Sequence, residues 1–121
     1  MRKKACAFFA VILVSAPFAS AQERSPSERQ ALLDLARILG QSNAIRQTCE
    51  GPQDGYWYTR MERLLAVEAA DQDLKRRLGL SFNAGYNETR ALYPQCVDAA
   101  RAEARRIAKT AEALSEKLAG P

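Results

Sequence analysis

The side chains that most often carry out chemistry in proteins are scarce in this chain of 121 residues. It contains no histidine, and its three cysteines are Cys6, Cys49 and Cys96. Histidine is the commonest general base and a principal metal ligand, so its absence removes the usual routes to acid–base catalysis and to zinc or haem binding. We therefore expect no catalytic residue, no metal site and no cofactor, and we interpret the protein as a non-enzyme.

Carboxylates are the remaining candidates for acid and base groups. Glu62, Glu68, Asp71 and Glu88 could pair across a cleft as in a glycoside hydrolase. Helix surfaces carry such residues as solvated charge far more often. A cell-wall hydrolase is therefore the least favoured of the functions that we consider.

Cys49 and Cys96 are well separated in the chain and could form one disulfide. The alternatives are two buried free thiols or a metal pair, but no third thiolate or histidine completes a metal site. The two residues also lack the close spacing of a catalytic dithiol. We predict a structural disulfide between them.

The N-terminus has the three regions of a secretory signal peptide. Three positive charges within residues 1–4 precede the apolar run 5–14, and Ala19-Ser20-Ala21 follows with the small residues that signal peptidase reads. We expect cleavage after Ala21, loss of Cys6 with the signal, and a periplasmic location.

A stable membrane anchor is the competing interpretation of the same segment. The apolar run is shorter than the roughly 20 residues that a bilayer span needs, and Pro17 interrupts its end. Cleavage would also lower the 18 basic residues to 15 against 14 acids, a net charge of +1. We therefore expect neither a membrane anchor after cleavage nor a nucleic-acid partner.

The elements that would position any site are helices. Ser25-Pro26-Ser27-Glu28 is a capping box with proline at the first helical position. Apolar residues then recur at spacings of three and four, and no alternating run is long enough for a strand. We predict an all-α protein, one domain over residues 22–121, as a small bundle of about four helices closed by one disulfide. The expected helices are 26–48, 55–69, 72–92 and 95–118.

The last expected helix has the clearest apolar stripe, which we call the C-terminal seam. Its members are Val97, Ala100, Ala104, Ile107, Ala111, Leu114 and Leu118. The stripe is typical either of a core helix or of a surface that binds a partner. We expect an envelope protein, or a second copy of the chain, to contact Ile107, Ala111, Leu114 and Leu118.

Aromatic and basic clusters suggest further contact surfaces. Tyr56-Trp57-Tyr58 stands at the entry to the second expected helix, where Trp57 can anchor the core beside the disulfide while the tyrosines cover its edge. The alternative is that Tyr56 and Tyr58 form a contact patch for a partner or glycan. A basic cluster on the last helix lies off the seam and comprises Arg101, Arg105, Arg106 and Lys109. Such clusters are usually a solvated face; otherwise anionic polymers or lipid headgroups would be their natural target.

The run Phe82-Asn83-Ala84-Gly85-Tyr86, with Cys49 and Cys96, resembles an uncharacterised family of small exported alphaproteobacterial proteins with two bridged cysteines. The resemblance implies export and a disulfide, but no activity. Many members carry a histidine within the first helix, whereas this chain has Asn43 in that neighbourhood. Gly85 would let another helix approach closely, and Asn83 could bond a buried backbone group.

These observations favour a non-enzymatic periplasmic protein with a structural or interaction role at the cell envelope. A disulfide-stapled chaperone, similar to the acid-stress chaperones of the periplasm, is the alternative, by analogy of size and cysteine separation alone.

Overall fold

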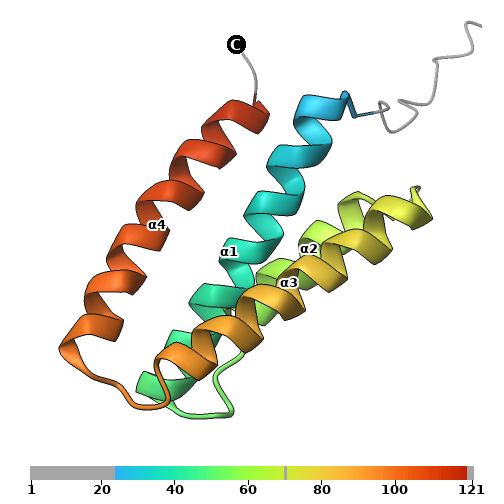
Figure 1. The fold of residues 1–121 in the computed structure, drawn as a ribbon. Helices are drawn as coiled ribbons and strands as arrows, with labels where there is room; N and C mark the ends of the chain where they lie inside the picture. The colour runs from blue at the N-terminus through green and yellow to red at the C-terminus, as the bar shows by residue number, and fades with distance from the viewer. Residues whose placement is uncertain (1–23, 70, 120–121) are drawn as a thin grey trace, which may run out of the picture.

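The computed structural model describes residues 24–69 and 71–119, and within these ranges it contains helices and no strand. The helices are α1 (Pro26–Glu50), α2 (Tyr56–Val67), α3 (Gln72–Leu92) and α4 (Asp98–Ala119), arranged as Figure 1 shows. The predicted all-α fold is confirmed. The expected signal peptide, with its cleavage point and Cys6, lies outside the described residues.

Helix α1 is the centre of the molecule. The capping box predicted at its start is present, with the Ser25 hydroxyl accepting from the amide of Glu28. The other three helices all pack against α1, and α2 also touches α3. Among the described residues α4 packs against α1 alone, on the side away from α3 (Figure 1). The neighbouring helices surround α1. For this reason the residues from Gly40 to Ile45 are all buried except one, which is half-buried.

Helices α1 and α3 run in the same direction and cross with their backbones in contact. An Arg29–Asp71 ion pair joins their first turns, and the Tyr86 hydroxyl donates to Gln47 Oε1 at 2.8 Å near their ends. A Cβ atom on Gly85 would lie 2.1 Å from the carbonyl oxygen of Arg37. The close approach expected at Gly85 is therefore confirmed.

The role expected for Asn83 is wrong. Its side chain is exposed, because it lies on the outer face of α3 between Phe82 and Gly85, which meet α1, and among the described residues no buried backbone group bonds to it. The helix-facing positions of this segment are Phe82 and Gly85, which are both buried.

The helix ends differ slightly from the expected ones. Gly55 occupies the N-cap position of α2 without a side-chain cap, and the Asp54 carboxylate accepts from the amide of Tyr56 at 3.1 Å. Helix α4 begins at Asp98, three residues later than expected, because the segment before it carries Cys96 back to the end of α1. The two cysteines are joined as a disulfide with a Cα–Cα distance of 4.9 Å.

Two apolar clusters hold the helices together. One combines Leu32, Leu39, Met61, Leu74 and Leu78 from α1, α2 and α3, and half-buried Trp57 packs against it. The other joins α4 to α1. Its members are Ile38, Ile45, Ala100 and Ile107, with Ala104, Ala111 and Leu114 packed against them.

Candidate functional site

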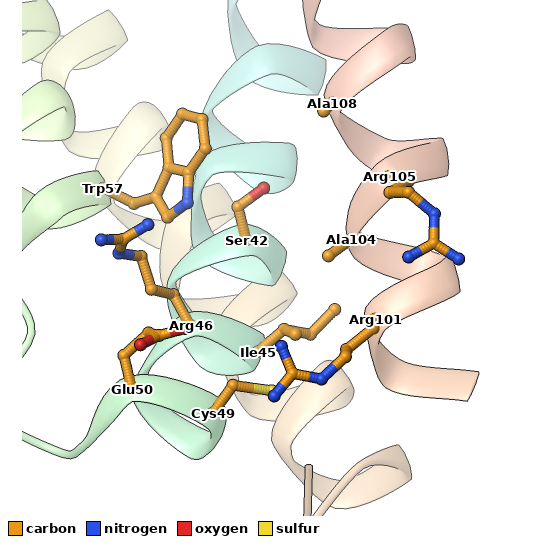
Figure 2. A pocket seen from close by; sticks show the side chains of 10 residues that line it. All are labelled: Ser42, Ile45, Arg46, Cys49, Glu50, Trp57, Arg101, Ala104, Arg105 and Ala108. Atoms are coloured by element: carbon orange, nitrogen blue, oxygen red, sulfur yellow. The ribbon is translucent and has the colours of Figure 1, made fainter. Parts of the chain in front are cut away.

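A cleft of about 370 Å³ opens between α1, the start of α2 and α4, and Figure 2 shows the side chains around it. Ser42, Ile45 and Cys49 of α1 form its floor. Trp57 stands on one side, and Ala104 and Ala108 of α4 stand on the other. The cleft is open for two reasons. The backbone of α4 contacts that of α1 but not that of α2, and the two alanines leave space that larger side chains would fill.

The charged residues around the cleft are mostly basic. Arg46, Arg101 and Arg105 line it against one carboxylate, that of Glu50. The Arg46 guanidinium donates to Asp54 Oδ1 at 2.8 Å, so its charge is partly compensated. Arg101 and Arg105 form no ion pair with any described residue. The cleft therefore presents an excess of positive charge beside an apolar wall, which suits an anionic ligand.

Tyr56 is partly exposed but is held by neighbouring cations. Its ring lies 4.5 Å from the Arg46 guanidinium carbon and 3.6 Å from that of Arg60. Trp57 meets the same ring edge to face, with centroids 4.9 Å apart. Cation–π contacts of this kind stabilise side chains at partly exposed sites. They order the aromatic edge of the cleft.

Tyr58 points away from this arrangement. It is 52% exposed, and its ring lies 6.3 Å from that of Phe82 at an edge-to-face angle. The two tyrosines that we expected to act together therefore lie in different surroundings, because successive residues of α2 turn to different faces of the helix.

The C-terminal seam is the contact of α4 with α1. Ile107 is 1% exposed, and Ala111 and Leu114 are half-buried against the same cluster. Leu118 packs against the cluster that contains Leu32. While α4 is docked, α1 covers these four positions.

The sequence analysis did not single out the face of α4 that lines the cleft. Arg101, Arg105 and Ala108 lie beside the seam, and Ala104 is a seam residue that also lines the cleft. The basic cluster was the feature of the sequence that could have identified this face. Its members differ in their surroundings: the guanidinium of Arg106 is bound to Glu103 at 2.9 Å, whereas Arg101 and Arg105 lack such a partner among the described residues.

The four candidate carboxylates do not converge on a cleft. Glu68 is buried and accepts from Arg24 at 2.8 Å, and Glu88 is paired with Arg37. The amide of Leu74 and then the guanidinium of Arg29 hold the pKa of Asp71 below its usual value. Glu62 is exposed on α2. A glycosidase acid needs a raised pKa, which is the opposite of the shift at Asp71.

The part of the chain that the structure describes lacks both a metal-binding cluster and a membrane-spanning helix. It holds no group of three or more cysteine, aspartate or glutamate residues placed to bind a metal ion. None of its helices combines the length and apolar character needed to cross a membrane.

Comparison with known proteins relates nearly the whole helical part of the chain to others. Residues 26–120 match the model of a family described as protein of unknown function, DUF2385. No curated protein and no solved structure matches the chain.

Proposed function

The chain belongs to the DUF2385 family, whose function is unknown, and from this premise we propose that it is a non-enzymatic binding protein of the cell envelope. The observation that carries the proposal is the cleft between α1, α2 and α4. It combines an indole ring with Arg101, which extends toward Cys49, and with Arg105 on the α4 rim, whose guanidinium turns away from the indole (Figure 2). Neither arginine forms an ion pair with a described residue. The partner that it suits is anionic and has an apolar part.

Binding is favoured over catalysis by the chemistry of the cleft residues. Arginine stays protonated at any physiological pH, so Arg101 and Arg105 can attract and orient an anion but cannot exchange protons with it. Cys49 is joined to Cys96 and is not a free nucleophile. Ser42 is the hydroxyl of the cleft, and no histidine exists to activate it.

An exported address fits both the N-terminal pattern and the cysteines. The charged, apolar and small-residue regions before Ala21 are those of a signal peptide. A disulfide between distant cysteines persists in an oxidising compartment such as the periplasm. Fractionation of cells that express the full chain should recover the protein, shortened by 21 residues, from the periplasm. Recovery of the uncleaved chain from the cytoplasm would refute this address.

Site-specific photo-crosslinking in the native cell tests the binding role. A photo-reactive residue in place of Glu50, at the rim of the cleft, should capture an envelope component under ultraviolet light. The same residue in place of Leu92, which is 72% exposed on α3, is the matched position outside the cleft. Crosslinks from position 50 alone would support the proposal.

A charge-reversal pair makes the test specific to the cleft. Arg101→Glu with Arg105→Glu should abolish the crosslink from position 50. Lys109→Glu with Lys117→Glu changes the charge of α4 equally at exposed positions that do not line the cleft and should leave it intact. Equal crosslinking in both double variants would contradict the proposal.

A further inference from the structure

A second hollow lies nearer the start of α1 and shares no lining residue with the cleft. It has a volume of about 310 Å³ and lies between the first half of α1, the end of α2 and the end of α4. Its walls are mainly apolar, with Leu35 from α1, Leu64 and Val67 from α2, and Leu118 from α4. We call the cleft and the second hollow together the trough. Both parts lie beside α1 between α2 and α4, whose backbones are not in contact with each other.

Eight of the residues that line the trough are spaced at intervals of seven along their helices. They are Leu35, Ser42 and Cys49 on α1, Trp57 and Leu64 on α2, and Arg101, Ala108 and Ser115 on α4. Residues seven apart lie on one face of a helix, so each set forms a line nearly parallel to its helix axis. The fourteen steps along the chain from Leu35 to Cys49 rise about 21 Å.

From this geometry we propose that the trough binds an acidic amphipathic helix of a partner protein, about four turns long. This inference rests on the proposed function and names the element that occupies the site. Lines of residues seven apart on neighbouring helices form a surface against which a further helix can pack. Ser42, Ala108 and Ser115 are small, so the incoming backbone can come close to α1 and α4.

The positive charges on both rims of the trough indicate that the partner helix is negatively charged. Arg101 and Arg105 stand on the α4 side of the trough, and Arg63 stands on the α2 side. None of the three forms an ion pair with a described residue. A helix with leucine or alanine facing α1 and glutamate on both flanks would complement the floor and both rims at once.

A lipid acyl chain is the other occupant that an apolar trough could take, and the floor argues against it. The hydroxyl of Ser42 interrupts the apolar surface at the middle of the line along α1. A helix tolerates that hydroxyl, because small polar residues occur within helix–helix contacts, whereas an acyl chain cannot bond to it.

Trp57 is the chain's single tryptophan and lines the trough, so its fluorescence reports occupancy. The probe is a synthetic 18-residue peptide with leucine and alanine at spacings of three and four and glutamate on both flanks. We expect it to shift Trp57 emission in the disulfide-bonded mature protein, to gain helicity on binding, and to bind more weakly as salt rises. A peptide with lysine in place of each glutamate should not bind.

Variants locate the binding. Arg101→Glu with Arg105→Glu should lower the affinity for the glutamate peptide by about tenfold or more, because two attractive charge interactions become repulsive. Lys109→Glu with Lys117→Glu should change its affinity less than about twofold, because exposed charges off the site act weakly. Circular dichroism of both variants checks that each is folded.

The contrary results are distinct. Equal affinity for the glutamate and lysine peptides, or equal weakening in the two double variants, would overturn the helix proposal. Dodecanoate or anionic vesicles that shift Trp57 emission where the glutamate peptide does not would assign the trough to a lipid. In that case, cleft-specific crosslinks in cells would still uphold the binding function, whereas their absence would remove both proposals.

Discussion

Gly40 of α1 lies directly against the carbonyl oxygen of Phe82 in α3, because a Cβ atom built on Gly40 would stand only 2.0 Å from that oxygen. The contact is reciprocal, since Gly85 of α3 meets the carbonyl of Arg37 in the same way. The two glycines set how closely α1 and α3 approach. Everything that packs on the opposite side of α1, including the cleft, depends on this crossing.

Replacing Gly40 by alanine should therefore destabilise the fold strongly. The added methyl group would collide with backbone atoms that move only if the two helices separate, at a cost of about 3 kcal/mol. Urea unfolding followed by circular dichroism measures the change. Gly79→Ala is the matched control on α3, where a Cβ atom meets nothing within 4 Å. Because alanine has a higher helix propensity than glycine, Gly79→Ala should raise the free energy of unfolding by up to about 1 kcal/mol. An equal loss of stability in Gly40→Ala and Gly79→Ala would contradict this explanation.

The disulfide should contribute a large part of the stability. Cys49 and Cys96 are 47 positions apart, and closing a loop of that size is worth about 4 kcal/mol in the chain-entropy model. Cys49→Ala with Cys96→Ala should lower the unfolding midpoint accordingly. Mass spectrometry of the unreduced mature protein should show two hydrogens fewer than the reduced chain. A free thiol at either position would refute the bond.

Ile107 should hold α4 on α1. It is 1% exposed in the cluster that joins these helices, and truncating such a side chain to alanine costs about 3 kcal/mol. Limited proteolysis of Ile107→Ala should cut first within α4, while α1 to α3 persist longer. Leu92→Ala, at an exposed position on α3, should change stability by less than about 0.5 kcal/mol. A fully stable Ile107→Ala protein with weakened partner binding would instead assign the C-terminal seam to a partner.

Stability should fall in acid, in part because of Asp71. The Leu74 amide and the Arg29 guanidinium hold its pKa below the usual value of 3.8 in the folded protein. Its contribution is therefore complete above the unfolded pKa and is lost as pH falls through the lower folded pKa. Asp71→Asn keeps an N-cap side chain but removes the charge, so its unfolding midpoint should vary less with pH below about 4.

Thermal unfolding at a series of pH values measures this dependence. Glu116→Gln removes an exposed carboxylate that has no ion-pair partner among the described residues and serves as the control. Its pH profile should match that of the parent. Parallel profiles for the parent and Asp71→Asn would show that Asp71 has no part in the acid response.

Much of the architecture was predictable because its causes are local. The hydroxyl of Ser25 and the carboxylate of Glu28 define the start of α1 within four residues of chain. Spacings of three and four identify the apolar face of each helix without reference to its neighbours. The cysteine pair was predictable from number and separation. The signal peptide, the periplasmic address and the absence of enzymatic activity remain predictions.

The tertiary structure alone decided which surfaces meet and what is left between them. Periodicity shows that Ile107 lies on an apolar face, but only packing shows that α1 covers it. Once α4 is docked there, Arg101 and Arg105 line the same cleft as Trp57, a residue more than 40 positions away in the chain. The pairing of helices depends on long-range complementarity, such as that of Gly40 with the backbone of α3, and no local pattern encodes it. For this reason the sequence by itself determined the helices and the disulfide, and the site emerged only from their arrangement.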